Sequence, residues 1–216
     1  MVALPDNHDG REREWQFEAE DLSAVHRWLM DQPFLPHITI VDGPEKILSD
    51  IYFDTPGRAI FNAGYALRIR ERDGNPEATM KSLKGGSGAL RIREEINEPL
   101  SRIDPAALTA STGPVAERIR EIACGAELSR FLEIRTQRRV LLMTARESVL
   151  AEVALDRTVF PEVADPDSAA ILRVEVEIIE GREENLLPLV ETLRKSCSLR
   201  AMMTSKLEAG LQARSI

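Results

Sequence analysis

The feature that most constrains the fold is a period-two alternation of apolar and charged residues, clearest in the segment GYALRIRER at 64–72. Leu67 and Ile69 fall on one side of an extended chain, whereas Arg68 and Arg70 fall on the other. This alternation predicts a β-strand whose two faces differ in character. Since Ser, Thr, Lys or Glu would serve equally well on a solvated face, the repeated guanidinium groups need a further explanation.

The same alternation recurs along most of the chain. Strands are predicted at 12–18, 37–41, 47–54, 64–72, 77–84, 90–97, 131–144, 149–159 and 171–179. Segments rich in Gly, Pro, Asn and Asp, such as DTPG, RDGNPE and KGGSG, separate neighbouring strands. The short spacing favours an antiparallel meander, and KGGSG is interpreted as a hairpin turn because it lacks the phosphate-loop pattern.

Helical periodicity appears between and after these strands. Helices are predicted within 20–32, over 115–123, and at about 183–197 and 204–213. No internal repeat or linker marks a second domain, so we expect one α+β domain over residues 1–216. Periodicity alone leaves two architectures open: an open sheet with helices on one face, or a closed barrel clad by helices.

Charged residues on the predicted strands are sorted by sign. Arginine dominates one group of strands, at Arg68, Arg70, Arg91 and Arg93, while carboxylates dominate others, at Glu12, Glu14, Glu18, Glu152, Asp156, Glu175 and Glu177. A solvated outer face explains any single strand, but the repetition favours one enclosed site. A closed sheet would then have a polar lumen, with apolar residues such as Trp15 and Phe17 packed outside under helices.

The two residue types suit two different ligands. The guanidinium group presents fixed donors that match phosphate oxygens and retains its charge. Carboxylates gathered together are unfavourable unless a cation lies among them, and hard oxygen ligands suit Mg²⁺ or Mn²⁺. The histidines and cysteines show no zinc-ligand spacing. The pattern therefore favours a polyphosphate held with a divalent metal ion.

These residues resemble the CYTH superfamily of triphosphate tunnel metalloenzymes over about residues 10–210. The similar segments, in chain order, are an E-x-E-x-K-like start at Glu12, Glu14 and Gln16, YFDTP with Asp54, L-R-x-R with Arg68 and Arg70, T-x-K with Lys81, R-x-E with Arg93 and Glu95, T-x-R with Arg138, E-x-x-x-D with Glu152 and Asp156, E-x-E with Glu175 and Glu177, and Ser-Lys with Lys206. Single motifs of this length are weak, whereas this whole series in one order is specific.

The resemblance implies an eight-stranded antiparallel β-barrel, a tunnel with a polar lumen, that hydrolyses a triphosphate with Mg²⁺ or Mn²⁺. It implies metal binding by Glu12, Glu14, Glu175 and Glu177, catalysis with Glu12, Glu14, Glu152 and Asp156, and substrate binding by Gln16, Arg68, Arg70, Lys81, Arg93, Arg138 and Lys206, with Lys84 as the alternative to Lys81. The expected substrate is inorganic tripolyphosphate or a small organic triphosphate such as thiamine triphosphate.

Two departures from the family pattern leave alternatives open. Gln16 stands where the signature has Lys, and Asn97 stands where a second acid often ends the R-x-E-x-E strand. Gln donates a hydrogen bond to a phosphate oxygen but brings no charge. The alternatives are therefore a class IV adenylate cyclase-like activity on ATP and a polyphosphate-binding module without catalysis.

The overall charge excludes some partners. The 216 residues carry 36 acidic and 28 basic side chains, a net charge of −8, which argues against general nucleic-acid binding.

No apolar run approaches the roughly 20 residues of a membrane span, and no secretory signal is visible at the start, so we expect a cytoplasmic protein without membrane contact. The oligomeric state stays open, with a homodimer as one alternative.

Overall fold

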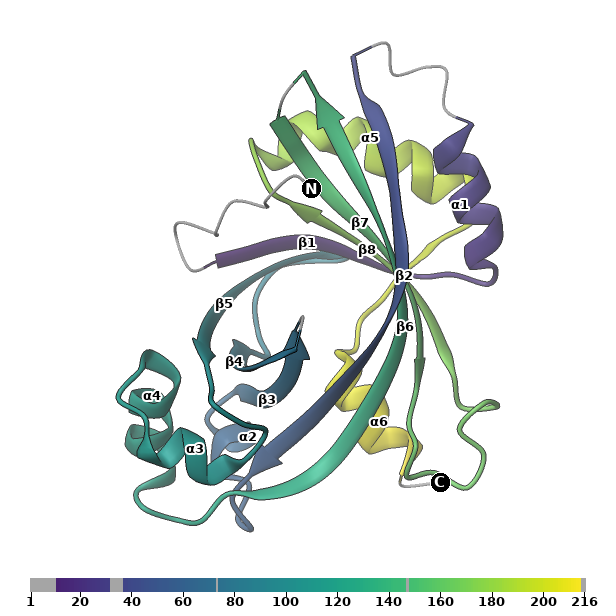
Figure 1. Ribbon diagram of the computed structural model, residues 1–216. Coiled ribbons are helices and arrows are strands. Elements are labelled where there is room, and N and C mark those ends of the chain that lie inside the picture. The colour runs from purple at the N-terminus through teal and green to yellow at the C-terminus, as the bar shows by residue number, and fades with distance from the viewer. Residues whose placement is uncertain (1–10, 32–36, 73, 147, 215–216) are drawn as a thin grey trace.

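The strands of the chain close into a barrel around which the helices are arranged (Figure 1). The computed structural model describes residues 11–31, 37–72, 74–146 and 148–214. The elements are β1 (Arg11–Glu18), α1 (Leu22–Met30), β2 (Thr39–Asp54), α2 (Ala59–Asn62), β3 (Tyr65–Arg72), β4 (Asn75–Ser82), β5 (Leu90–Pro99), α3 (Pro105–Ala110), α4 (Pro114–Ala123), β6 (Ser129–Ala145), β7 (Ser148–Val159), β8 (Ile171–Ile178), α5 (Glu183–Ser196), β9 (Arg200–Ala201) and α6 (Lys206–Ala213). Residues 1–10, on which the prediction of no secretory signal rests, lie outside the described residues.

The sheet closes because its two ends pair with each other. The strand order is β5-β4-β3-β2-β6-β7-β8-β1-β9, and β5 also pairs with β1. Every pairing is antiparallel, and the closing pair aligns Glu12 with Arg93 and Trp15 with Leu90. The predicted eight-stranded antiparallel barrel is therefore confirmed, with the two-residue β9 added beside β1.

The apolar strand faces point outward, toward the helices. Leu67 and Ile69 of β3 are fully buried in a cluster with Ile60 of α2, Leu108 of α3 and Val115 of α4. Successive residues of a strand point to opposite faces, so the intervening arginines of β3 must face the lumen. The hydrophobic core thus lies between the barrel wall and its helices, and the polar lumen follows from it.

A second apolar cluster covers the opposite part of the barrel. Trp15 and Phe17 of β1 are buried with Val25 and Leu29 of α1 and with Leu193 of α5. Figure 1 shows α1 and α5 side by side over the end of the barrel formed by β1, β7 and β8. The prediction that these two aromatic residues pack outside the barrel is confirmed. Their burial stabilises the closed sheet, at roughly 2–3 kcal/mol for each large apolar side chain.

The prediction of two separate strands at 37–41 and 47–54 was wrong. The chain instead runs through both as the single long strand β2, with a register shift between Asp42 and Glu45 against β6. Gly43 and Pro44 lie at this irregularity, where an added Cβ on Gly43 would approach the Val140 carbonyl oxygen to 2.7 Å. A bulge accommodates proline without ending the strand, which is why the Gly-Pro pair is not a break.

Two buried carboxylates fix short helices against the barrel. Asp54 accepts hydrogen bonds from the backbone N–H groups of Ile60 (2.9 Å) and Phe61 (3.0 Å), which start α2. Glu98 accepts bonds of 3.0 Å from the N–H groups of Val115 and Ala116 at the start of α4. Asp54, part of the YFDTP resemblance, therefore has a structural role as a helix cap.

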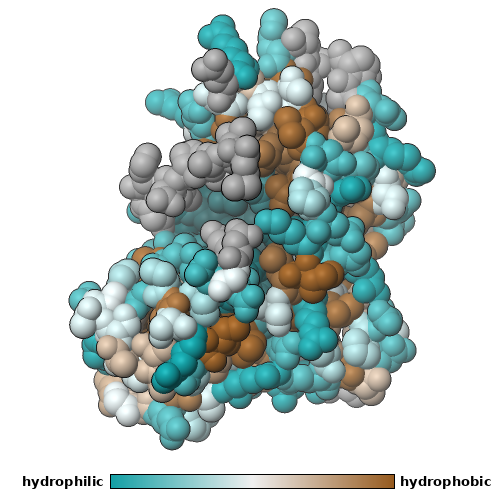
Figure 2. Space-filling model, viewed as in Figure 1, coloured by the Kyte–Doolittle hydropathy of each residue, from teal (hydrophilic) through white to brown (hydrophobic). Residues whose placement is uncertain are grey.

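The exterior is mostly hydrophilic, with hydrophobic side chains in separate patches on the face shown in Figure 2. No helix within the described ranges is both long enough and apolar enough to span a membrane.

Candidate functional site

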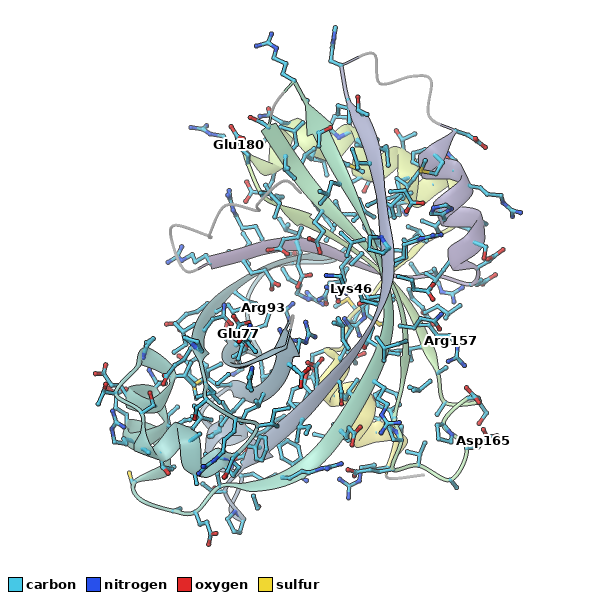
Figure 3. All side chains as sticks on the ribbon, viewed as in Figure 1. Lys46, Glu77, Arg93, Arg157, Asp165 and Glu180 are labelled. Carbon is cyan, nitrogen blue, oxygen red and sulfur yellow. The ribbon has the colours of Figure 1, made fainter. Side chains whose placement is uncertain are left out.

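The barrel encloses a charged cavity of about 580 Å³. Its charged lining is Glu12, Glu14, Arg68, Arg70, Lys81, Arg93, Glu95, Arg138, Glu152, Arg173, Glu175, Glu177 and Lys206. In Figure 3 Arg93 lies within the barrel, whereas Arg157, Asp165 and Glu180 lie on its outside. Because this charged lining comes from seven strands and α6, the barrel closure itself assembles the site.

One side of the cavity, here named the acidic wall, consists of Glu12, Glu14, Glu95, Glu152 and Glu177 with the cations Lys81 and Arg93. Strand register brings them together, since Glu14 lies opposite Glu177 and Glu152 lies opposite Glu177 from the other side. Lys81 Nζ pairs with Glu12 and lies 3.3 Å from Glu95 Oε2. Arg93 Nη2 pairs with Glu14 and lies 3.6 Å from Glu12 Oε2. Five carboxylates therefore share two cations.

This excess of negative charge changes the acidity of the wall. Burial, with the neighbouring charge of Glu14, raises the pKa of Glu177 to about 7. Burial and the same neighbour hold the pKa of Glu12 well above its usual value. Burial alone would also raise the pKa of Glu95, but Lys81 and Arg68 lower it to about 2. A bound cation would relieve the repulsion between carboxylates that raises the pKa of Glu12 and of Glu177.

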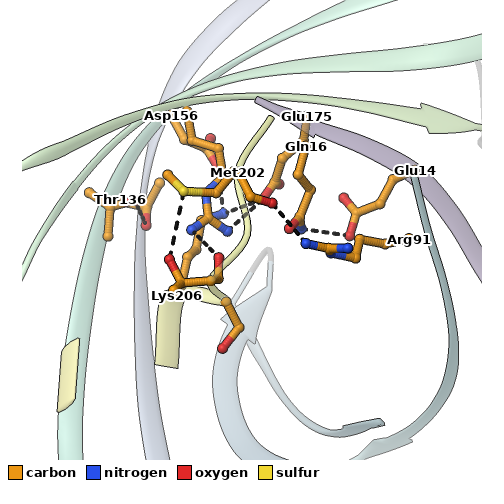
Figure 4. A network of polar contacts seen from close by, with 12 residues as sticks. Glu14, Gln16, Arg91, Thr136, Asp156, Glu175, Met202 and Lys206 are labelled. Carbon is orange, nitrogen blue, oxygen red and sulfur yellow. Dashed lines mark hydrogen bonds and ion pairs between the residues drawn. The ribbon is translucent and has the colours of Figure 1, made fainter. Parts of the chain in front are cut away.

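The adjoining part of the lumen, here named the basic wall, consists of Arg138, Arg173 and Lys206 with the carboxylates Asp156 and Glu175. Figure 4 labels Lys206 and the two carboxylates. Arg138 donates to both oxygens of Asp156, at 2.7 and 2.6 Å, and to Glu175 at 2.5 Å. Lys206 Nζ donates to the same two carboxylates, at 2.6 and 3.0 Å. Burial alone would raise the pKa of Glu175, but Lys206, Arg138 and Arg173 hold it well below its usual value.

A second cationic group, here named the arginine pair, consists of Arg68 and Arg70 with Asp50. Arg70 Nε and Nη2 form a bidentate pair with the Asp50 oxygens, at 2.6 and 2.7 Å, and Arg68 Nη1 lies 3.6 Å from Asp50 Oδ2. Burial alone would raise the pKa of Asp50, but the two arginines hold it well below its usual value. Tyr52 lies opposite Arg68 in the β2–β3 register and also lines the cavity. Asp50 thus orients Arg70 and leaves Arg68 with only a long contact.

The lumen is therefore electrically divided. The acidic wall has three more negative than positive groups, whereas the basic wall and the arginine pair each have one more positive than negative group. An anion is favoured near the cationic groups and a cation near the acidic wall, and the low dielectric of an enclosed site strengthens both preferences. A polyphosphate with a divalent cation satisfies both at once.

The donor set of the acidic wall fits a hard divalent cation. All of its potential ligands are carboxylate oxygens, which Mg²⁺ and Mn²⁺ prefer. The described residues hold no preassembled group of three or more ligand side chains, because Lys81 and Arg93 pair with Glu12 and Glu14. Glu175, also predicted as a metal ligand, pairs with Lys206 and Arg138 instead. Metal binding would therefore require these ion pairs to rearrange.

Gln16 lies between the two walls. Its side chain is buried and Nε2 donates a 2.9 Å hydrogen bond to Glu14 Oε1, as Figure 4 shows. Its backbone lies opposite Glu175 in the β1–β8 register. Gln16 Oε1 is buried and accepts no hydrogen bond from the part of the chain that the structure describes.

Most residues that the sequence predicted for the site line the cavity, and the others are placed as follows. Asp156 lies fully buried behind the lining, held by Arg138 and Lys206. Lys84, the alternative to Lys81, is exposed in the loop after β4. Glu18 and Arg91 share the sorted charges, but Glu18 is an exposed partner of Arg200 and Arg91 donates to the Met202 carbonyl.

Sequence reasoning missed three polar residues of the site. Asp50, Tyr52 and Arg173 were not assigned, although each stands on the lumen side of a predicted strand. For Arg173 the signal was present, because it continues the alternation of Glu175 and Glu177 in RVEVE. For Asp50 the signal was weak, since its neighbours at 48 and 52 on the same face are Leu and Tyr.

Comparisons with known proteins agree with this architecture. The family model described as CYTH domain matches residues 35–211, a range that begins after β1. A candidate adenylyl cyclase from Hippeastrum, reported with a dominant triphosphatase activity, has a TM-score of 0.68 at 19% identity and covers 93% of this chain and 95% of its own. A candidate adenylate cyclase from Bacillus halodurans has a TM-score of 0.61 at 19% identity, covering 92% and 97%. One from Vibrio parahaemolyticus has a TM-score of 0.56 at 17% identity, covering 95% and 100%. At these identities the likeness establishes the fold.

Proposed function

The chain belongs to the CYTH domain family, and from that premise we propose that it hydrolyses a triphosphate inside the barrel with the help of Mg²⁺ or Mn²⁺. The substrate class is inorganic tripolyphosphate or a small organic triphosphate such as thiamine triphosphate. The observation that carries the proposal is the division of one enclosed lumen into an acidic wall and cationic groups.

The cationic groups bind the phosphate chain in this proposal. Arg68 donates from the arginine pair, and Arg138 and Lys206 donate from the basic wall, where substrate oxygens compete with Glu175 for their hydrogen bonds. Lys81 and Arg93 donate from the acidic wall, and Gln16 adds a neutral donor. Phosphoryl transfer depends mainly on positioning and charge neutralisation, which such a cage of donors supplies.

The acidic wall holds the metal ion and handles the water. Glu12, Glu14 and Glu177 are the residues that would hold the ion, which when bound supplies neutralisation of charge on the phosphate oxygens. Glu175 joins them only if it leaves Lys206 and Arg138. Glu152 orients the attacking water and accepts its proton, since it lines the cavity beside Glu177 and lies 4.0 Å from Arg138 Nη1. Asp156 keeps Arg138 and Lys206 in place.

A phosphate-release assay tests the proposal. Tripolyphosphate, thiamine triphosphate and ATP are each supplied with Mg²⁺ or Mn²⁺ and, in parallel, with EDTA. We expect metal-dependent release of phosphate from at least one of them. Cyclic AMP from ATP would instead mark the cyclase alternative, and tight tripolyphosphate binding with no phosphate release would mark the non-catalytic alternative.

A matched pair of variants assigns the activity to the lumen. Glu152→Gln is expected to reduce phosphate release at least a hundredfold while leaving tripolyphosphate binding in place, because the general base is lost and no cation is removed. Glu180→Gln changes the exposed carboxyl shown outside the barrel in Figure 3 and is expected to leave both unchanged. Equal activity in the two variants would exclude Glu152 from the reaction.

A further inference from the structure

Arg173 is a buried cation of the lumen that forms no hydrogen bond with a carboxylate of the described residues. Its side chain is 1% exposed and borders the cavity. Nη2 donates a 3.1 Å hydrogen bond to the Thr204 carbonyl, and Nη1 lies 3.6 Å from Glu175 Oε1, too far for a hydrogen bond. Nε finds no hydrogen-bond partner among the residues that the structure describes. A buried guanidinium with unused donor capacity beside a cavity calls for a partner.

The carboxylates of the basic wall are already used by other cations. Arg138 and Lys206 each contact both Asp156 and Glu175 at hydrogen-bonding distance. The wall therefore has three cations for two carboxylates, and Arg173 makes only the long contact. An excess positive charge buried in this way is costly unless an anion is bound.

The unused donor of Arg173 is matched by an unused acceptor on the neighbouring strand. Gln16 lies opposite Glu175, the carboxylate that Arg173 approaches, and its buried Oε1 likewise lacks a hydrogen-bond partner within the described ranges. A lysine at position 16 would point at Glu175 from β1, as Arg173 approaches it along β8. The two positions therefore give alternative sources for one positive charge at this point of the lumen.

We propose that Arg173 is a substrate-binding residue that donates to a phosphate group of the triphosphate and supplies the positive charge that Gln16 does not. This inference rests on the proposed function, and it adds a residue that the strand motifs did not assign. In the bound state Arg173 directs its unused donors to phosphate oxygens, while the Thr204 carbonyl continues to orient Nη2.

Calorimetry with tripolyphosphate, without metal, tests this assignment in four proteins: the wild type, Arg173→Met, Gln16→Lys and the double variant that carries both changes. We expect Arg173→Met to weaken binding at least tenfold and the double variant to recover most of the loss. Gln16→Lys alone adds a second cation beside the one that Arg173 already supplies, so we expect it to strengthen binding by less than tenfold. Arg157→Met, on the outside of β7, is the matched control and should bind like the wild type.

Each other outcome has a definite meaning. If Arg173→Met folds and binds like the wild type, Arg173 is not a substrate ligand. If it binds weakly and Gln16→Lys does not restore the affinity, Arg173 acts only by holding the chain at Thr204, and the proposal is overturned. If Arg173→Met does not fold, the Gln16→Lys variant decides, since a gain above tenfold with Arg173 present would show that the two charges are not interchangeable. Failure of the wild type to bind tripolyphosphate would overturn the proposed function itself.

Discussion

Glu177→Gln is expected to make the metal-free protein more stable at alkaline pH, although it removes a residue of the proposed metal site. The Glu177 carboxyl is partly buried on the acidic wall, opposite Glu14 and Glu152. Its ionised form is therefore disfavoured by burial and by like charge in the folded chain, but not in the unfolded chain. Gln keeps the shape of the side chain and removes the charge.

The magnitude follows from the raised pKa. With a pKa of about 7 in the folded chain, against a usual value of 4.5, ionising Glu177 costs the fold on the order of 3 kcal/mol above pH 7. Solvent in the lumen screens part of this cost, so we expect a gain of about 1–3 kcal/mol in the free energy of unfolding at pH 8. The gain shrinks as the pH falls from 7 to 4.5, because the folded wild type then binds a proton at Glu177.

Urea unfolding in EDTA at pH 8 and pH 5 measures the effect, with Glu180→Gln as the exposed control. The reasoning requires a stabilised Glu177→Gln at pH 8, a gain below about 1 kcal/mol at pH 5, and an unchanged control at both. A variant that is less stable than the wild type at pH 8, or equally stabilised at both values, would refute the electrostatic account of the acidic wall.

Three further predictions concern the same lumen and its frame. The affinity for Mg²⁺, measured by calorimetry, should rise about tenfold per pH unit up to about pH 7 and then level off, because bound metal displaces the proton of Glu177. An affinity that does not change with pH would contradict this. Arg70→Met should lower the free energy of unfolding, measured by urea titration, by about 3–5 kcal/mol, because it leaves Asp50 buried without its partner. Adding Asp50→Asn should recover most of the lost stability. If Arg70→Met causes no loss, the pair does not stabilise the fold. Gly85→Ala should lower the melting temperature, because φ at Gly85 is +134° and the new Cβ would lie 2.0 Å from the Ile92 carbonyl oxygen. The control Gly57→Ala places its Cβ in open space and should leave the melting temperature unchanged. Equal melting temperatures for the two variants would count against this packing.

The barrel was predictable because its strands carry period-two signals on both faces. The apolar faces predicted the covering helices, and the sorted charges predicted a polar lumen. The long strand β2 was not predictable from local signals, since the cost of a Gly-Pro pair depends on the partner strand that forms the bulge with it. Turn signals describe the chain alone, whereas strand continuity depends on pairing.

The composition of the site was more predictable than its pairing. Alternation places Glu14, Glu177 and Arg138 on the lumen side, but it does not say which carboxylate meets which cation. Asp50 and Asp156 are examples, because their ion pairs depend on register with β3 and β6. Register is set by the whole sheet, so the division of the lumen into walls of opposite charge emerges only in three dimensions.

The pairing of β1 between β8 and β5 has a consequence for how the chain is made. Among the described strands β1 comes first in the chain, and it pairs with β8 only after β2 to β7 have been synthesised. One edge of β1 can pair once β5 has been made, but the edge that pairs with β8 stays available to wrong partners until then, and such distant pairings form slowly. A chain that lacks the residues up to Glu18 has no β1, so β5 and β8 would be left as open edges, and we expect that product to self-associate during synthesis.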